Sequence, residues 1–184
     1  QRAFPPRAVL TAQTVQCDIQ DVDAGLEAYS SPAFYMIPPI DALMQNTIRI
    51  NRSSTADGIE LYTTLAHEGY PGHLYQTVYS SLVCDTQTLP IRKLFSYGGY
   101  VEGWAYYTER ISYEYAAQVL AEAEGSLGSS YPVALLCTLL AQQRDLQINL
   151  FCLLDLSLHY YGAEESELLR SLESFGLSEE QSER

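Results

Sequence analysis

His67-Glu68-Gly69-Tyr70-Pro71-Gly72-His73 contains two of the three histidines in the chain. Zinc-binding helices commonly carry the pattern His-Glu-x-x-His, in which the histidines lie one turn apart and the Glu serves as a base. The spacing here is two residues longer, so on a straight helix the two side chains differ in direction by about 240°. The stretch therefore predicts a shared metal only if the helix is interrupted between the histidines.

Pro71 and Gly72 supply such an interruption. Pro71 lacks an N–H, and its ring would clash with the carbonyl of His67, so the helix must bulge or break. Gly72 tolerates the unusual dihedral angles that follow. A bulge that absorbs two extra residues would return His73 to the face of His67. The alternative is an ordinary helix end with two exposed histidines, and the metal site also needs a third ligand.

A second segment offers that ligand. Glu102, Tyr106 and Glu109 have the spacing of one helical face, in a helix that follows Gly98 and Gly99. Catalytic zinc commonly takes two His and one carboxylate and keeps a fourth position for water. Glu102 is the candidate ligand, and Glu109 is placed to orient a ligating imidazole. The alternative for Glu109 is a solvated charge that pairs with Arg110.

The composition narrows the class of protein. The chain has 184 residues, of which 47% are apolar, and 23 Asp and Glu stand against 10 Lys and Arg. This acidic balance argues against nucleic-acid binding, because phosphate backbones require positive charge. No segment has the pattern of a signal peptide or a membrane span. Both ends look cut, since the chain starts at Gln1 and stops in a polar run, so the compartment stays open between secreted, lipid-anchored and cytoplasmic.

The periodicity predicts a mainly helical α+β fold in a single catalytic-core domain over residues 1–184. Residues 1–52 alternate in places and are expected to form short strands and loops, whereas residues 53–184 have helical periodicity and carry the zinc site. The expected strands are 14–19, 33–37 and 46–51. The expected helices are 53–67, 90–98, 100–123, 132–161 and 164–174, with Gly162 ending the fourth.

These residues resemble the domain of unknown function 885 family. The central matches are His67–His73 with Gln76, and Glu102–Ala105 with Glu109. Further matches are Ser31–Tyr35, Pro38-Pro39, Arg144, Asp155, His159 and Gly162, so the resemblance covers residues 30–162. That family is grouped with the zincin-type metallopeptidases of the gluzincin kind. Its members are usually much longer, so this chain is expected to be a fragment of a longer protein.

The resemblance implies one zinc ion per chain, bound by His67, His73 and Glu102, with Glu68 as general base. It implies a mostly helical fold with the zinc helix beneath a small antiparallel sheet. In such enzymes an edge strand often holds the substrate backbone by strand addition. We expect residues 46–51 to be that strand, with Ile48 and Ile50 toward the core and Thr47, Arg49 and Asn51 on the other face as substrate-binding residues.

The oxyanion that forms during hydrolysis needs a donor besides the metal. His159 is one candidate, since Asp155 lies one turn before it and an Asp–His pair fixes a tautomer. The alternative is an ordinary histidine at the end of an apolar helix. Tyr106 is another candidate donor.

The predicted function is a zinc-dependent hydrolase that cleaves peptide bonds through a metal-activated water. Three alternatives stay open. The plainest is ordinary helical-bundle packing with no metal, although a Pro inside a helix costs about 3 kcal/mol or more and would need another reason. Another is a non-catalytic binding or structural module with a zincin-like fold, although a purely structural zinc site does not need a base such as Glu68. The third is a metal-dependent hydrolase of non-peptide amides or esters. Oligomeric state is not predicted.

Overall fold

A computed structural model describes residues 15–39, 41–56, 58–83, 95, 97–127 and 133–177. The chain forms two compact units, Gln1–Cys137 and Thr138–Arg184. Within the described residues, the strands all lie before residue 51 and the α-helices after residue 57, which is the division that the periodicity predicts. The helix expected over 90–98 falls mostly outside the described residues.

The first unit contains a three-stranded mixed sheet. Its strands are β1 (Gln16–Asp21), β2 (Ala33–Met36) and β3 (Gln45–Ile50), in the order β1-β3-β2. β2 is antiparallel to β3, whereas β1 is parallel to it. The mainly helical α+β class is therefore confirmed, but the antiparallel sheet is wrong for one of the two pairs. β3 lies between two strands that run in opposite directions, so it must be parallel to one of them.

The strand order also overturns the expected substrate strand. β3 is central, so its backbone bonds to a neighbouring strand on each side and it has no free edge for strand addition. The substrate-binding role expected of Thr47, Arg49 and Asn51 loses its basis here. The Arg49 guanidinium instead donates to the carbonyl of Asp21 at 3.0 Å, and Asn51 is buried.

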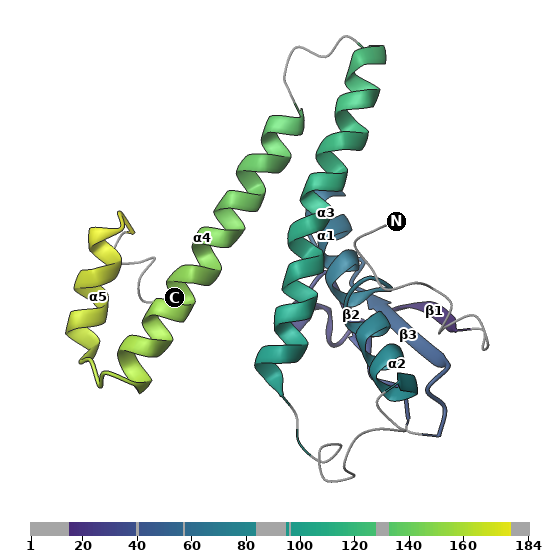
Figure 1. Ribbon diagram of the computed structural model, residues 1–184, viewed down its shortest axis with the longest axis horizontal. Helices are drawn as coiled ribbons and strands as arrows, with labels where there is room; N and C mark the ends of the chain where they lie inside the picture. Colours follow the sequence, from purple (N-terminus) through teal and green to yellow (C-terminus); the bar gives the residue numbers. More distant parts are fainter. Residues whose placement is uncertain are drawn as a thin grey trace. The chain divides into compact units, whose positions relative to one another are not determined.

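This unit also contains the 3-10 helix η2 (Glu27–Tyr29), the start of α4 (Val133–His159) and three complete α-helices. The complete helices are α1 (Gly58–Glu68), α2 (His73–Val83) and α3 (Gly98–Leu127). α1 packs against both β2 and α3, and α2 contacts α3 (Figure 1). One face of the sheet and α2 form the core, whose buried members are Ala33, Ile48, Leu74, Tyr75 and Val78. α1, which carries His67 near its end, therefore contacts both the sheet and α3.

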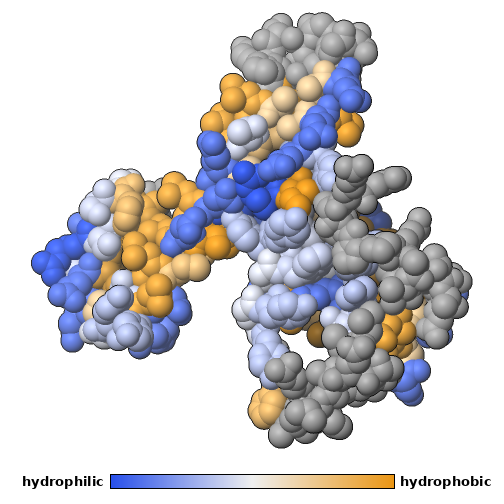
Figure 2. Space-filling view, viewed as in Figure 1, coloured by the Kyte–Doolittle hydropathy of each residue, from blue (hydrophilic) through white to orange (hydrophobic). Residues whose placement is uncertain are grey.

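The second unit contains α4 (Val133–His159) from Thr138 onward and the whole of α5 (Glu165–Ser174). Gly162 has φ +68°, a left-handed conformation that glycine adopts without strain, and it follows α4 as predicted. Figure 2 shows apolar residues at the surface of this unit. Leu139, Leu146 and Leu153 belong to the exposed large apolar residues of the chain. Among the helices that the structure describes, none has the length and hydropathy that a membrane crossing requires.

Candidate metal centre

The chain between the two histidines is a turn that separates two helices. α1 ends at Glu68 and α2 starts at His73. The amide of Gly69 still bonds to the carbonyl of Leu65 at 2.8 Å, and the amide of Gly72 closes a turn on the carbonyl of Gly69 at 3.1 Å. The predicted interruption is confirmed, and it takes the form of a complete break rather than a bulge.

Gly72 brings the two histidines together by lying directly against the backbone of His67. A Cβ atom at position 72 would be 1.7 Å from the carbonyl oxygen of His67, a distance no side chain can occupy. The close approach places the two imidazole rings 4.7 Å apart between centroids, nearly perpendicular at 83°. Glycine at position 72 is therefore a requirement of the turn and not only a tolerated residue.

Glu102 reaches the same place from α3. Its Oε2 atom lies 3.6 Å from Nε2 of His67 and 3.5 Å from Nε2 of His73. A tetrahedral zinc with bonds of about 2.0–2.1 Å keeps its ligand atoms roughly 3.3 Å apart. The Glu102 side chain is 66% exposed, whereas both imidazoles are largely buried. The three predicted ligands thus converge, and the two distances from Glu102 to the imidazoles are close to the spacing of zinc ligands.

Glu109 holds His67 from the other side. Its Oε2 is 3.0 Å from Nδ1 of His67, and its side chain is only 8% exposed. The solvated-charge alternative for Glu109 is therefore wrong. A proton on Nδ1 that is donated to Glu109 leaves Nε2 with its lone pair toward Glu102. The predicted contact of Glu109 with the His67 imidazole is present, while the role of that imidazole as a metal ligand stays a prediction.

The carboxylates around His67 also affect its protonation. Burial lowers the pKa of His67, but the hydrogen bond with Glu109 and the charges of Glu68, Glu109 and Glu102 outweigh burial, and the pKa lies above its ordinary value. The carboxylates thus favour positive charge at this imidazole, and the same charges would favour a metal ion that displaces the proton.

Glu68 is a second carboxylate close to both imidazoles. Ligand-capable atoms of His67, Glu68 and His73 all lie within 4.8 Å of one another. The Oε2 atom of Glu68, however, accepts the backbone N–H of Tyr35 at 3.0 Å, which ties it to β2. The Oε2 atom of Glu102 lies almost equally far from the two Nε2 atoms, at 3.6 and 3.5 Å. These contacts favour Glu102 as the third ligand and leave Glu68 beside the site.

The remaining predicted residues are Tyr106 on α3 and the pair of Asp155 and His159 on α4. Tyr106 is half-buried on α3, one turn after Glu102. His159 and Asp155 pair with each other at 3.6 Å on the second unit, where both side chains are exposed. The pair is present as predicted, and the catalytic roles of all three residues stay predictions.

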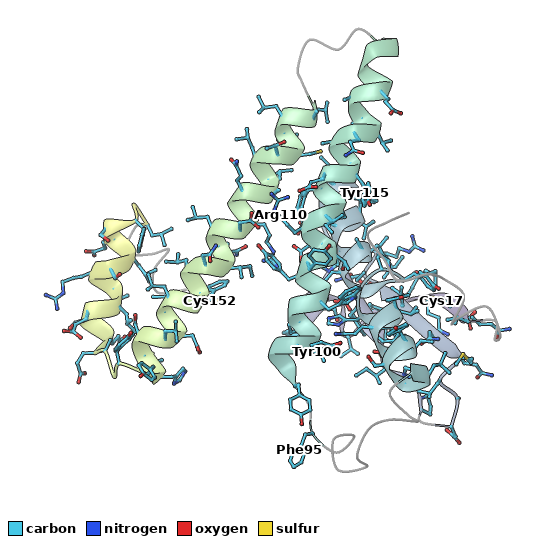
Figure 3. The ribbon with its side chains drawn as sticks, in the orientation of Figure 1. Cys17, Phe95, Tyr100, Arg110, Tyr115 and Cys152 are labelled. Atoms are coloured by element: carbon cyan, nitrogen blue, oxygen red, sulfur yellow. The ribbon has the colours of Figure 1, made fainter. Side chains whose placement is uncertain are left out.

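Further contacts between α3 and the histidine-bearing segment were not predicted. The indole Nε1 of Trp104 donates to the carbonyl of Pro71 at 2.8 Å, and Thr108 Oγ1 donates to the carbonyl of Ala66 at 3.2 Å. The side-chain Nε2 of Gln76 donates to the backbone carbonyl of Tyr100 at 3.2 Å. Tyr100 lies near the start of α3 (Figure 3). Each joins a side chain to a distant backbone carbonyl, which sequence periodicity does not encode.

A family model described as "Bacterial protein of unknown function (DUF885)" matches residues 2–181. The chain belongs to the DUF885 family. This confirms the family resemblance, while the zincin-type assignment stays a prediction. The DUF885 chain is also similar to a solved structure described as "the putative lipoprotein from Colwellia psychrerythraea", with a TM-score of 0.62 and 21% identity.

The match covers 92% of this DUF885 chain but 27% of that structure's chain, so the chain spans about a quarter of the length of its structural relative. At this identity the likeness shows a shared fold alone. No curated protein matches the chain.

Proposed function

We propose that this chain carries the metal centre of a zinc-dependent hydrolase that cleaves peptide bonds. The observation that carries the proposal is the position of Glu102 Oε2, 3.5 and 3.6 Å from the two imidazole Nε2 atoms. Two imidazoles and one carboxylate are a ligand set of catalytic zinc, whereas calcium and magnesium prefer oxygen ligands throughout. Bound zinc would lower the pKa of a water molecule and polarise the scissile carbonyl.

Glu68 is the proposed general base. It follows His67 in sequence and lies close to both imidazoles, and its Oε2 atom accepts the Tyr35 amide. A base in this position takes a proton from the attacking water and later gives it to the leaving amine. A structural zinc site has no use for such a group.

The edge of the sheet supports a peptide substrate. Within the residues that the structure describes, β2 is an edge strand, and the Tyr35 N–H donates to Glu68 rather than to β3. An extended peptide that added to this edge would lie along the strand whose backbone meets the general base. β2 therefore replaces β3 as the proposed substrate strand, and this arrangement favours a peptide over a compact amide or ester.

Metal content tests the first half of the proposal. We expect elemental analysis to find about one zinc per chain in the purified protein, and none in His73→Ala. His159→Ala is the matched control, since it removes the same side chain from the other unit, and it should keep its zinc. A folded wild type that takes up no zinc on reconstitution would overturn the metal centre.

Cleavage of a peptide library tests the second half. The wild type loaded with zinc should cleave, and Glu68→Gln should bind the same zinc but lose at least about 100-fold in rate. Equal rates for the two proteins would sink the mechanism. A chain that binds zinc and hydrolyses esters but no peptide would favour the non-peptide hydrolase, and one that binds zinc without any hydrolysis would favour the binding module.

A further inference from the structure

Trp104 joins the helix that carries Glu102 to the turn that separates the two histidines. It lies two residues after Glu102 on α3, and its indole N–H donates to the carbonyl oxygen of Pro71 at 2.8 Å. Pro71 is in the middle of the turn from Gly69 to Gly72. One helix therefore contacts the metal centre with a carboxylate and the intervening turn with an indole.

The turn needs an external hold because it lacks the regular hydrogen bonds of a helix. Pro71 has no N–H to contribute. Gly72 lies so close to the carbonyl group of His67 that no side-chain atom fits between them. If Pro71 moved outward, Gly72 and His73 would move with it, and the two Nε2 atoms would separate. The bond from Trp104 opposes that movement.

The indole is itself held in place. Its ring stacks on that of Tyr75 of α2, with 6.1 Å between the ring centroids and 22° between the ring planes. The centroid of the Tyr107 ring on α3 lies 5.9 Å away. It also packs, half-buried, against the core that the sheet and α2 form. The position of the N–H is thus set by packing on two helices before any metal binds.

We infer that Trp104 is a positioning residue for the metal centre: its N–H fixes the Pro71 turn and so holds His67 and His73 at the separation that a single metal ion requires. The inference rests on the proposed metal centre, but not on catalysis. A protein without this hydrogen bond must order the turn when metal binds, and the metal affinity falls by that cost. The competing role for Trp104 is core packing alone.

A change of one atom separates these roles. Trp104 is the only tryptophan in the sequence. The tryptophan analogue 3-benzothienylalanine, in which sulfur replaces the indole N–H, can therefore be incorporated at this position alone. Benzothiophene keeps the size and stacking of the ring but has no N–H. Trp104→Phe is a genetically encoded second variant that also removes the donor, and Tyr107→Phe is the control, because it changes a ring that contacts Trp104 and leaves the indole N–H in place.

Zinc affinity is measured by competition with a chromophoric chelator, together with the visible spectrum of the cobalt(II) form and the thermal midpoint of the metal-free protein. The benzothiophene protein should bind zinc about 10-fold more weakly than the wild type and show an altered cobalt spectrum, with a metal-free midpoint close to the wild type. Trp104→Phe should weaken zinc binding at least as much, and Tyr107→Phe should match the wild type.

Equal zinc affinity and identical cobalt spectra in the wild type and the benzothiophene protein would overturn the inference while leaving the proposed function intact. So would a loss of affinity that Tyr107→Phe shares in full, since this would assign the effect to packing. A wild type that binds neither zinc nor cobalt would overturn the metal centre itself, and the role of Trp104 with it.

Discussion

At the scale of single residues, Gly72 and Gly103 are opposite cases of the same residue type. A Cβ atom at position 72 would meet the carbonyl oxygen of His67 at 1.7 Å, whereas one at position 103 would meet nothing within 4 Å. Gly72 is therefore fixed by a close backbone approach that brings a second histidine to the first. Gly103, next to Glu102 on α3, has no such constraint in the described structure.

We expect Gly72→Ala to destabilise the protein by more than about 3 kcal/mol, because backbone must move to admit the methyl group. The variant should also lose zinc. Gly103→Ala is the control, and it should stabilise α3 by about 0.5–1 kcal/mol without loss of zinc, because Ala has the better helix propensity. Urea denaturation and metal analysis give both quantities. If Gly72→Ala kept its zinc and its stability, the close approach of residues 67 and 72 would be wrong.

Glu109 offers a second contrast, with Glu114 on the same helix. The Glu109 side chain is 8% exposed and faces His67, whereas that of Glu114 is 62% exposed and pairs with Arg110 at 3.3 Å. Glu109→Gln keeps the size of the side chain but removes the charge that favours a cation at His67, so zinc affinity should fall about 10-fold. Glu114→Gln should change it less than about twofold. Similar effects of the two substitutions on competitive zinc titration would remove the assigned role of Glu109.

At the scale of elements, Tyr35 links the sheet to the proposed metal centre. Its amide donates to Glu68, and its hydroxyl donates to Oδ1 of Asn46 on β3 at 2.6 Å. Burial raises the pKa of Tyr35 to about 12, against about 10 for an exposed tyrosine. The folded state therefore binds the phenolic proton more tightly than the unfolded state does.

This shift predicts an alkaline loss of stability that Tyr35 causes. Below pH 10 the group is protonated in both states and has no pH-dependent effect. As the pH rises from 10 toward 12, the unfolded state loses the proton first, so the free energy of unfolding falls. Tyr35→Phe should be less stable at neutral pH by about 1 kcal/mol, since it lacks the bond to Asn46. The difference from the wild type should shrink above pH 10 in urea denaturation, and a constant difference would contradict the shift.

The sequence predicts where helices and strands begin and end better than it predicts how the strands pair. The break before His73 is predicted because Pro71 acts locally through its missing N–H, and β2 and β3 are predicted because their side chains alternate. The order of the strands is not, because alternation within a strand says which face is buried but not which neighbour it pairs with. The expected substrate strand, 46–51, failed for this reason.

The same distinction holds within the candidate site. Glu102 and Glu109 are found from spacing, because residues seven apart share a face and both contact His67. The bond of Trp104 to Pro71 is not, because its acceptor is a backbone carbonyl 33 positions away, and every residue has one. A contact between two side chains can be predicted because their residue types suggest it. A contact to a backbone carbonyl cannot, because the acceptor is the same at every position.

At the scale of the whole molecule, the proposed site belongs to one unit. His67, Glu68, His73 and Glu102 all lie within Gln1–Cys137, as does Trp104, the only tryptophan. The second unit, with most of α4 and with α5, supplies none of the proposed ligands. A ligand stabilises the part of a protein whose folding creates its site, so zinc should act on the first unit alone if the two units unfold separately.

Thermal unfolding with two probes tests this independence. Tryptophan fluorescence reports Trp104 and hence the first unit, whereas far-ultraviolet circular dichroism also reports the helices of the second. Zinc at about 100 times its dissociation constant adds roughly 2.7 kcal/mol to the free energy of unfolding of the first unit. The unfolding midpoint seen by fluorescence should therefore rise by roughly 5–10 °C. The dichroism trace should divide into a component that moves with zinc and one that does not, and His73→Ala should abolish the movement. A single dichroism transition that moves as a whole would show instead that the two units unfold together, so that metal binding in the first also stabilises the second.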